Sequence, residues 1–257
     1  MAVQALESDF PNDRLPLLRW LMFTGVCVFG FVLVWYFGLF RLMLASDKTY
    51  ISAIIVVLYL ATCVHCFVRT VVISRELDAA HRVAALVGTG VSGFNVAGQN
   101  VVTSEGARLP PGAVTNHIRN LILKSRMQGR HRIDQTLLLR GLADALRGPN
   151  QLGSFAGDAL MKLGLLGTIV GFILMLAPIA GLDGADKVSV KNSMGLMSDG
   201  MAVAMYTTLT GLIGSVLLQM QYYLLDDATA KVFGLATDLT EVFVVSVLER
   251  EHDGQLR

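Results

Sequence analysis

Four stretches of the chain are each long and apolar enough to cross a bilayer as an α-helix. They run over residues 20–40, 49–68, 159–180 and 200–225, and Lys162 is the one Lys, Arg, Asp or Glu inside them. A helix spans the hydrocarbon core of a membrane with about 20 apolar residues. The sequence therefore predicts an all-α, polytopic membrane protein with four transmembrane helices.

Composition agrees with this class. Charged residues make up 16% of the 257-residue chain and apolar residues 53%, whereas roughly a quarter of the residues of a soluble domain are charged. The net charge of +1 gives no reason to expect a nucleic-acid partner. The 3 cysteines lie in apolar stretches and cannot all pair with one another, which argues against a disulfide-linked scaffold.

The start of the chain differs from a cleaved signal peptide. Residues 1–13 contain acidic residues and no basic one, whereas a signal peptide begins with a basic segment and a short apolar core. We therefore expect the first apolar stretch to be retained as a membrane helix.

Lysine and arginine are distributed unevenly between the connecting segments. Residues 69–157 hold eleven Lys/Arg against five Asp/Glu, while the connection between the third and fourth stretches is balanced. Cytoplasmic segments carry the excess of Lys and Arg. Residues 69–157 are therefore predicted to be cytoplasmic, which with four spans places both termini in the cytoplasm.

Four regions follow from these boundaries. Residues 1–68 form an N-terminal tail and the first two spans, and residues 69–157 a basic, helical cytoplasmic region. Residues 158–225 hold the last two spans, and residues 226–257 a C-terminal cytoplasmic helix.

The cytoplasmic region is predicted to contain helices and no strands. The second span is expected to continue through residues 69–87, and residues 114–126 and 133–147 carry apolar residues at spacings of three and four. Glycine-rich and proline-containing segments at 88–113 and 148–157 are expected to interrupt them. No strand-like alternation and no repeat is visible.

The C-terminal helix is predicted to be amphipathic and acidic. Seven Asp/Glu stand against three Lys/Arg over residues 226–257, so this tail and the basic region could meet within one subunit or between subunits. One apolar stripe is expected along it, formed by Val232, Leu235, Ala236, Leu239, Val242 and Phe243.

The last two spans combine small residues with hydroxyl groups on one face of each helix. Helical spacing groups Gly164, Thr168 and Gly171 in the third span, and in the fourth it groups Ala204, Thr208, Gly211 and Ser215. Such faces are typical of tightly packed membrane helices. They would also serve as a weakly polar groove for a partner helix, and the two interpretations are compatible.

No aspartate or glutamate lies within any span. A protein that carries protons needs a titratable group at membrane depth. His65 is the one candidate here, and it lies one turn from Arg69. If this chain conducts protons, the carboxylate is expected to come from a partner chain.

Two motifs resemble a known family. Gly164-Leu165-Leu166-Gly167-Thr168-Ile169-Val170-Gly171 resembles the Leu-Gly-Leu-Leu-Gly-Thr-Val-x-Gly signature of the TolQ/ExbB branch of the MotA/TolQ/ExbB proton-channel family. The segment from Ala204 to Leu212 resembles the Ala-Leu-x-(Ala/Thr)-Thr-Ala-x-Gly-Leu signature of the next span. The four-span layout, by contrast, resembles the flagellar MotA branch.

The resemblance implies a homopentameric ring in the bacterial inner membrane. The ring would enclose a dimer of a single-span partner of the MotB/TolR/ExbD type, whose helix carries the essential aspartate. Proton flow past that aspartate would couple the proton motive force to mechanical work, as in a stator or rotary motor, without ATP. The subunit would be neither an enzyme nor dependent on a cofactor or a metal.

The resemblance also implies roles for individual residues. Thr168 and Thr208 match the family's ring threonines that line the proton path, and Thr207 and Ser215 are further candidates for it. Packing around the partner helix is expected to involve Gly164, Gly167, Gly171, Ala204 and Gly211.

Some features depart from the family's pattern. Val203 stands where some members carry a glutamate, and the last span lacks the usual proline in its second half. The branch therefore stays open between a flagellar stator, an envelope energiser, a gliding motor and a defence system, and the ion between H⁺ and Na⁺. A non-conducting scaffold that packs around partner helices is the alternative function.

Of three further patterns, the first two fit ordinary structure better than a site, and the third fits either. Cys63-Val64-His65-Cys66 contains a Cys-x-x-Cys but no second pair of zinc ligands. The Gly-x-Gly-x-x-Gly of residues 88–93 has no strand–turn–helix setting, which favours a turn. A basic cluster could contact lipid headgroups or a partner, or form a solvated face; it consists of Lys124, Arg126, Arg130, His131 and Arg132.

Overall fold

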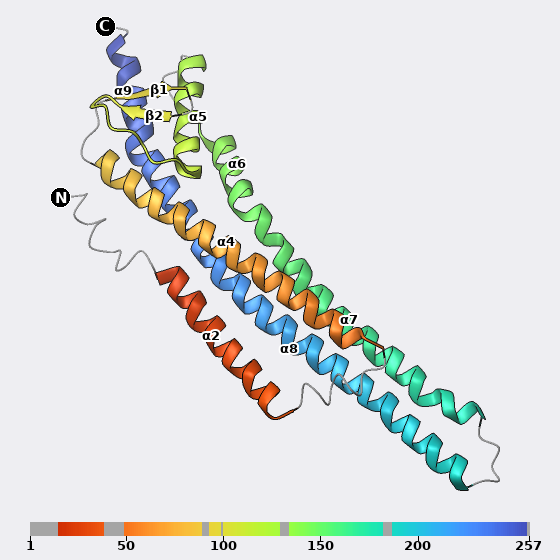
Figure 1. Cartoon of the computed structure of the whole chain (residues 1–257). Helices are drawn as coiled ribbons and strands as arrows, with labels where there is room; N and C mark the ends of the chain where they lie inside the picture. Colours follow the sequence, from red (N-terminus) through yellow and green to blue (C-terminus); the bar gives the residue numbers. More distant parts are fainter. Residues whose placement is uncertain are drawn as a thin grey trace. The chain divides into compact units, whose positions relative to one another are not determined.

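The structure is predominantly helical, as predicted. The computed structural model describes residues 15–38, 49–88, 93–98, 100–128, 134–181 and 187–255 (Figure 1). Its α-helices are α2 (Leu15–Tyr36), α4 (Ile51–Gly88), α5 (Ala113–Gln128), α6 (Thr136–Arg147), α7 (Gln151–Leu176), α8 (Lys187–Leu239) and α9 (Ser246–Gln255). Short 3₁₀ turns, η1 (Gly148–Asn150) and η2 (Ala177–Gly181), flank α7, and a π-helical segment, η3 (Thr240–Val245), joins α8 to α9.

Four helical stretches of the described chain are long and apolar enough to cross a membrane. They contain α2, α4, α7 and α8, which confirms the predicted count of four and the multi-pass class. The continuation of the second span is also confirmed, because α4 is unbroken to Gly88. By contrast, α8 begins at Lys187, whereas the predicted apolar span begins at residue 200. The first turns of α8 are more polar than the span, so the apolar pattern did not reveal them as helix.

Contacts divide the chain into two compact units. The span unit comprises residues 20–68 and 151–223, and the hairpin unit comprises the described residues among 1–19, 69–150 and 224–257.

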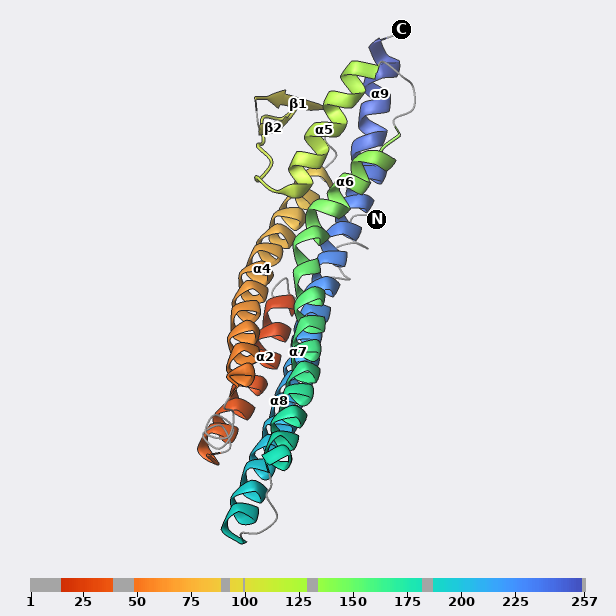
Figure 2. The same ribbon diagram turned by 90° about the vertical axis from the view of Figure 1, so that its right-hand side faces the viewer.

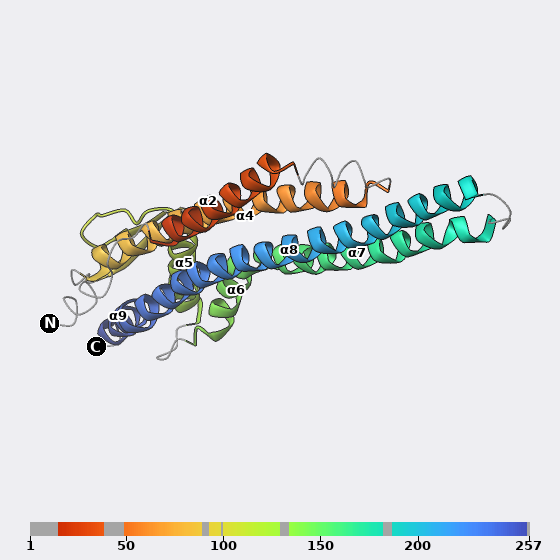
Figure 3. The ribbon, with the colours of Figure 1, turned by 90° about the horizontal axis from the view of Figure 1, so that it is seen from below.

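In the span unit, α7 and α8 run side by side in all three views (Figure 3). The beginning of α2 contacts the span part of α4, where the indole N–H of Trp20 donates to the Sγ of Cys66 at 3.3 Å. The Trp20 ring also lies against Phe67, with centroids 5.3 Å apart. Many of the remaining apolar side chains of these helices are exposed, as expected of helices that face lipid.

The hairpin unit takes its name from two short antiparallel strands, β1 (Phe94–Ala97) and β2 (Asn100–Thr103). Phe94 pairs with Thr103, and the hairpin lies beside α5 (Figure 2). The prediction of no strands was therefore wrong for this segment. Four-residue strands are too short for alternation to stand out, and the surrounding glycines suggested a loop.

The helices of the hairpin unit bury apolar faces against one another. On α5 the buried side chains include Ile118, Leu121 and Ile122, as the spacing of three and four predicted. The backbone N–H of Ala113 donates to the Oε2 of Glu76 at 2.7 Å. An acidic side chain at a helix N-terminus satisfies a free donor and interacts favourably with the helix dipole.

The predicted break at residues 148–157 is much shorter in the structure. Only η1 separates α6 from α7, and α7 begins at Gln151. Gly153 and Gly157 were expected in a loop but lie within the helix, where both are buried. Their contacts with α8 explain why glycine is accepted there.

The predicted C-terminal stripe is correct as far as Leu239 and then shifts. Val232, Ala236 and Leu239 are buried, but Val242 is 61% exposed, and Val244 and Val245 are buried instead. The π-helical segment causes the shift, because each i→i+5 turn accommodates an extra residue and rotates the following face.

Candidate ion pathway

Glycines of α7 form the closest approach between α7 and α8. A Cβ atom at Gly167 would lie 2.3 Å from the Oγ1 of Thr207, and one at Gly171 would lie 2.5 Å from the backbone nitrogen of Ala204. At Gly164 it would lie 3.2 Å from the Cα of Gly211. Separations this short exclude a larger side chain at Gly167 and Gly171 unless the helices move apart.

The facing residues of α8 complete this contact. A Cβ atom at Gly211 would lie 2.7 Å from the carbonyl oxygen of Leu160. Thr207 is fully buried, and its hydroxyl lies 2.8 Å from the carbonyl of Val203, one turn earlier in α8. The glycines, Ala204 and Thr207 together form what we call the glycine seam, which comprises Gly164, Gly167, Gly171, Ala204, Thr207 and Gly211.

The Thr208 hydroxyl and the Thr168 backbone N–H share one acceptor, the Gly164 carbonyl, at the edge of the glycine seam. The Thr208 hydroxyl lies 3.2 Å from the carbonyl oxygen of Gly164 on α7 and 3.0 Å from that of Ala204. Within α7, the same Gly164 carbonyl is the i−4 acceptor of the Thr168 backbone N–H. The Thr168 hydroxyl donates to Leu165 at 2.5 Å. Both threonines are partly exposed, so a partner helix has access to them.

Ser215 lies two turns beyond Thr208 on α8 and is buried. Its hydroxyl accepts a hydrogen bond from the Nε2 of Gln219 at 3.3 Å. Seven residues of α-helix rise about 10 Å. The two hydroxyls therefore share a face of α8 but are too far apart for a direct contact.

Polar residues that the sequence reasoning missed lie further along α8. The Tyr222 hydroxyl is 2.7 Å from the Nδ1 of His65, and the Cys63 thiol donates to the Oε1 of Gln221 at 3.3 Å. A Cβ atom at Gly153 would lie 2.2 Å from the Tyr222 ring. Extending the glycine spacing of α7 backwards from Gly164 would have revealed Gly157 and Gly153 as part of the same face.

The Cys-x-x-Cys segment has no metal-site geometry. Among the described residues, no three His, Cys, Asp or Glu side chains are placed to hold a metal ion. Cys63 and Cys66 contact different partners, Gln221 and Trp20, and none of the three cysteines is in a disulfide.

The two remaining sequence patterns lie partly outside the described residues. This applies to residues 89–92 of the glycine motif and to residues 130–132 of the basic cluster. Of the cluster, Lys124 donates to the carbonyl of Asp134. The guanidinium of Arg126 donates to the Oδ1 of Asn95 at 3.2 Å.

A buried asparagine joins three segments of the hairpin unit. The Nδ2 of Asn150 donates to the Oδ1 of Asp226 at 2.8 Å and to the hydroxyl of Thr229 at 3.1 Å. The Arg69 guanidinium donates to the carbonyl of Leu146 at 3.1 Å. These contacts fix the junction between α6 and α7 to the adjoining parts of α4 and α8.

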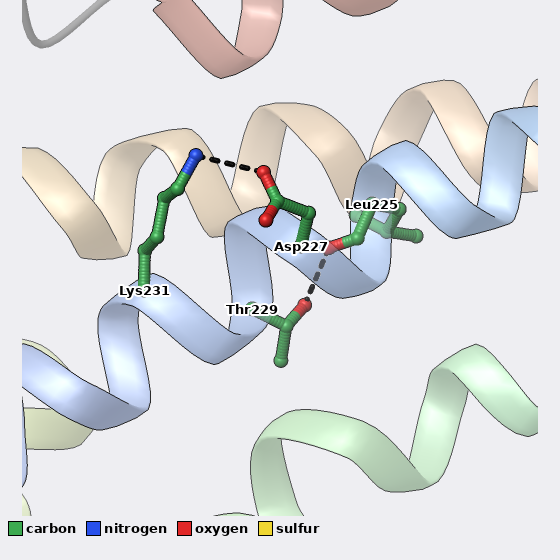
Figure 4. Close-up of polar contacts among 4 residues, drawn as sticks. All are labelled: Leu225, Asp227, Thr229 and Lys231. Carbon is green, nitrogen blue, oxygen red and sulfur yellow. Dashed lines mark hydrogen bonds and ion pairs between the residues drawn. The ribbon is translucent and has the colours of Figure 1, made fainter.

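The same part of α8 is held by its own side chains (Figure 4). Lys231 forms an ion pair with Asp227 at 2.7 Å, and the Thr229 hydroxyl donates to the carbonyl of Leu225 at 2.8 Å. Exposed pairs of this kind contribute about 0.3–0.5 kcal/mol. The buried Asn150 contacts are therefore the stronger constraint on this junction.

Two groups of the hairpin unit have shifted pKa values. Burial lowers the pKa of His117, and a hydrogen bond with the Gln135 side chain opposes this effect. Gln135 in turn donates to the carboxylate of Glu241 in η3. The side-chain and backbone donors of Thr136 lower the pKa of the exposed Asp134.

Comparison with known families gives a match to part of the chain. Residues 118–235 match the MotA/TolQ/ExbB proton channel family. No curated protein matches the chain. The match includes the motifs at residues 164–171 and 204–212, confirms the resemblance inferred from them, and indicates a membrane protein of the proton-channel type.

Proposed function

We propose that this member of the MotA/TolQ/ExbB proton channel family is the proton-conducting ring subunit of an ion-driven, rotary motor in the bacterial inner membrane. Five copies would enclose a dimer of a single-span partner of the MotB/TolR/ExbD type. The partner's helix would carry the aspartate that binds the proton, and both termini of the present chain would lie in the cytoplasm.

The observation that carries the proposal is the contact of the Thr208 hydroxyl of α8 with the Gly164 carbonyl of α7, one helical turn before Thr168. Two helices that contact each other through glycine leave the hydroxyls of Thr168 and Thr208 at the edge of the contact. Each hydroxyl bonds to a carbonyl of its own helix. Because a hydroxyl rotates freely about its C–O bond, each is able to turn toward an acceptor on a neighbouring helix.

The chemistry needed is stabilisation of a carboxylate at membrane depth. A lone carboxylate there is costly, and hydrogen-bond donors lower that cost. Thr168 and Thr208 would donate to the aspartate when it is charged and accept from it when it is protonated. Each proton that crosses a potential of 100 mV releases about 2.3 kcal/mol, which repeated steps would convert into movement of ring against partner.

The alternative function is a scaffold that only packs around partner helices. The glycine seam favours it, since small residues at a helix contact are sufficient for tight association in a membrane. A scaffold does not need the threonine hydroxyls, so these separate the two proposals.

The first experiment isolates the assembled complex. We would purify the tagged chain from its host in mild detergent, then identify co-purifying proteins by mass spectrometry and measure the size of the complex. A ring that contains a single-span protein with an intramembrane aspartate would support the motor. A ring without any such protein would leave the proton without a carrier and would favour the scaffold.

The second experiment removes the hydroxyls. Thr168→Val and Thr208→Val keep nearly the same volume. Thr210→Val is the control, because Thr210 follows Thr208 by two residues and so lies on a different face of α8, where its hydroxyl bonds to Tyr206. A conducting subunit would assemble normally in all three variants but lose proton flux in the first two. Normal flux in every variant would support the scaffold.

A further inference from the structure

His65 and Tyr222 form a polar pair within the span unit that the proposed pathway does not yet use. The Nδ1 of His65 lies 2.7 Å from the Tyr222 hydroxyl. The two rings are nearly parallel, at 17°, with centroids 6.3 Å apart. Tyr222 is 4% exposed, so its hydroxyl is directed to the histidine rather than to solvent.

The Tyr222 ring packs directly against Gly153 of α7, where the glycine has no side chain to obstruct it. A Cβ atom at Gly153 of α7 would lie 2.2 Å from the ring. A phenylalanine would fill the same space equally well. The hydroxyl therefore adds the contact with His65 to the packing of the ring.

This pair is able to take up a proton without losing its hydrogen bond. A tyrosine hydroxyl is both donor and acceptor, so it donates to a neutral imidazole and accepts from a protonated one. Histidine is also the side chain whose ordinary titration lies between about pH 5 and 8. Among the described residues of the spans, His65 is the only histidine.

The other ionisable groups of the helices packed here are few. On α4 they are Tyr59, Cys63 and Cys66, and on α8 they are Tyr222 itself and Tyr223. The next charged residues along those helices are Arg69 and Asp226, one turn further on. The nearest on α7 is the exposed Asp158. On α2, Arg19 precedes Trp20 and is exposed.

Tyr222 continues the line of hydroxyls that begins at Thr208. Thr208, Ser215 and Tyr222 follow at intervals of seven residues, so they share one face of α8. Each interval rises about 10 Å, which water and the Gln219 side chain would bridge. Glycines of α7 lie opposite this face: Gly164 at Thr208, Gly157 at Gln219 and Gly153 at Tyr222.

We propose that His65, hydrogen-bonded to Tyr222, receives the protons that leave the threonine site and releases them to the cytoplasm. This inference rests on the proposed function. Tyr222 passes its hydroxyl proton to Nδ1 and takes the excess proton from a protonated water on the side of Ser215, which leaves neutral water. The imidazolium then loses a proton to water, and only O–H and N–H bonds form and break.

Two variants test the pair while preserving its packing. In His65→Asn, the side-chain amide replaces Nδ1 as a hydrogen-bonding partner of Tyr222 but does not bind a proton. In Tyr222→Phe, the ring stays against Gly153 and the hydroxyl is lost. His81→Asn, on the same helix in the hairpin unit, and Tyr223→Phe, an exposed neighbour, are the matched controls.

The measurement is proton flux in the native host. Cells that carry a pH-sensitive fluorescent protein receive an external acid pulse, and the initial rate of cytoplasmic acidification is recorded between about pH 5 and 8. Complex assembly is quantified in the same cells. We expect normal assembly, at least about tenfold lower flux in both variants, and loss of the pH dependence of flux in His65→Asn.

Unchanged flux and an unchanged pH profile in assembled His65→Asn and Tyr222→Phe would overturn the inference. A different result would contradict the proposed function: no proton flux through the wild-type complex, or a normal proton flux in Thr208→Val. If the variants do not assemble, the protonation of His65 is instead measured in the wild-type complex from its ¹⁵N chemical shifts. Protonation of His65 over the pH range in which flux changes supports the inference, and a ring that stays neutral there overturns it.

Discussion

The side chain of Thr207 on α8 fills the space that a Cβ atom of Gly167 on α7 would need. The two positions are separated by 40 residues in the sequence. A methyl group on Gly167 would nevertheless lie 2.3 Å from the Oγ1 of Thr207. Thr207 is fully buried, and its hydroxyl bonds to Val203 and Ala204 of its own helix. It therefore has no open direction in which to move away.

Substitution of Gly167 is expected to separate the two helices. Gly167→Ala places a methyl group where Thr207 already lies, and overpacking of this kind costs about 1–3 kcal/mol. We expect a lower thermal midpoint of the detergent-solubilised complex and less assembled ring. Gly195→Ala is the control, because nothing lies within 4 Å of that position on α8. Equal behaviour of the two variants would contradict the close contact.

The α6–α7 junction depends on the hydrogen bonds that Asn150 donates. Asn150→Asp keeps the shape but replaces the donor with a carboxylate beside Asp226, which lies 2.8 Å from the amide. Loss of the buried bond alone costs about 1–3 kcal/mol. Repulsion between the two carboxylates adds to this cost, and the Arg69 guanidinium, which lies 3.5 Å from the Oδ1 of Asn150, offsets a part of it. We expect faster hydrogen exchange at the start of α7 and less assembled complex.

A second substitution tests the charge explanation. Asp226→Asn in the Asn150→Asp background restores one donor and one acceptor, so we expect most of the lost protection to return. Asn120→Asp, at an exposed position of α5, should have little effect. A double variant no better than Asn150→Asp would show that repulsion is not the cause.

The sequence predicted those features that depend on local pattern. A membrane helix must satisfy all its backbone donors and acceptors internally, so apolar length alone predicted α2, α4, α7 and α8. The spacing of apolar residues predicted α5 and α6. The hydroxyl-bearing faces of the last two spans were visible because Thr168 follows Gly164 by four residues in one helix and Gly211 follows Thr208 by three in the other.

Features that depend on partners distant in sequence were not predicted. Gly153 looked like a loop glycine because the ring that packs on it, Tyr222, is 69 residues away. Asn150 similarly follows Gly148 and Pro149, and nothing local indicates its bonds to Asp226 and Thr229. In both cases a residue typical of loops is used for a tertiary contact.

Protonation of His117 is expected to destabilise the hairpin unit. Burial lowers its pKa from the ordinary value of 6.5, so the unfolded state binds more protons than the folded state as pH falls below that value. Stability is thus fully present above pH 6.5 and decreases as pH falls toward the lowered pKa. The contribution of Asp134, whose pKa is lowered from 3.8, is lost only in a more acidic range.

Hydrogen exchange of α5 measures this effect. After correction for the intrinsic pH dependence of exchange, wild-type α5 should lose protection between about pH 7 and 5. His117→Gln removes the titrating group while keeping hydrogen-bonding capacity toward Gln135, so its protection should vary less with pH. The same loss of protection in His117→Gln would exclude His117 as the cause.

Deletion of Val242 is expected to be tolerated, although it lies inside a long helix. The π-helical segment contains one residue more than an α-helix would, and Val242 is exposed. Removing it would convert η3 to α-helix and leave Val244, Val245 and Leu248 on the buried face that Val232, Ala236 and Leu239 begin. Deleting Lys231, which is also exposed, would instead rotate every later residue by about 100°.

The helical content by circular dichroism and the yield of assembled complex should therefore stay near wild type when Val242 is deleted and fall when Lys231 is deleted. A loss in both would mean that the π-helical segment is itself required, through the contact of Glu241 with Gln135.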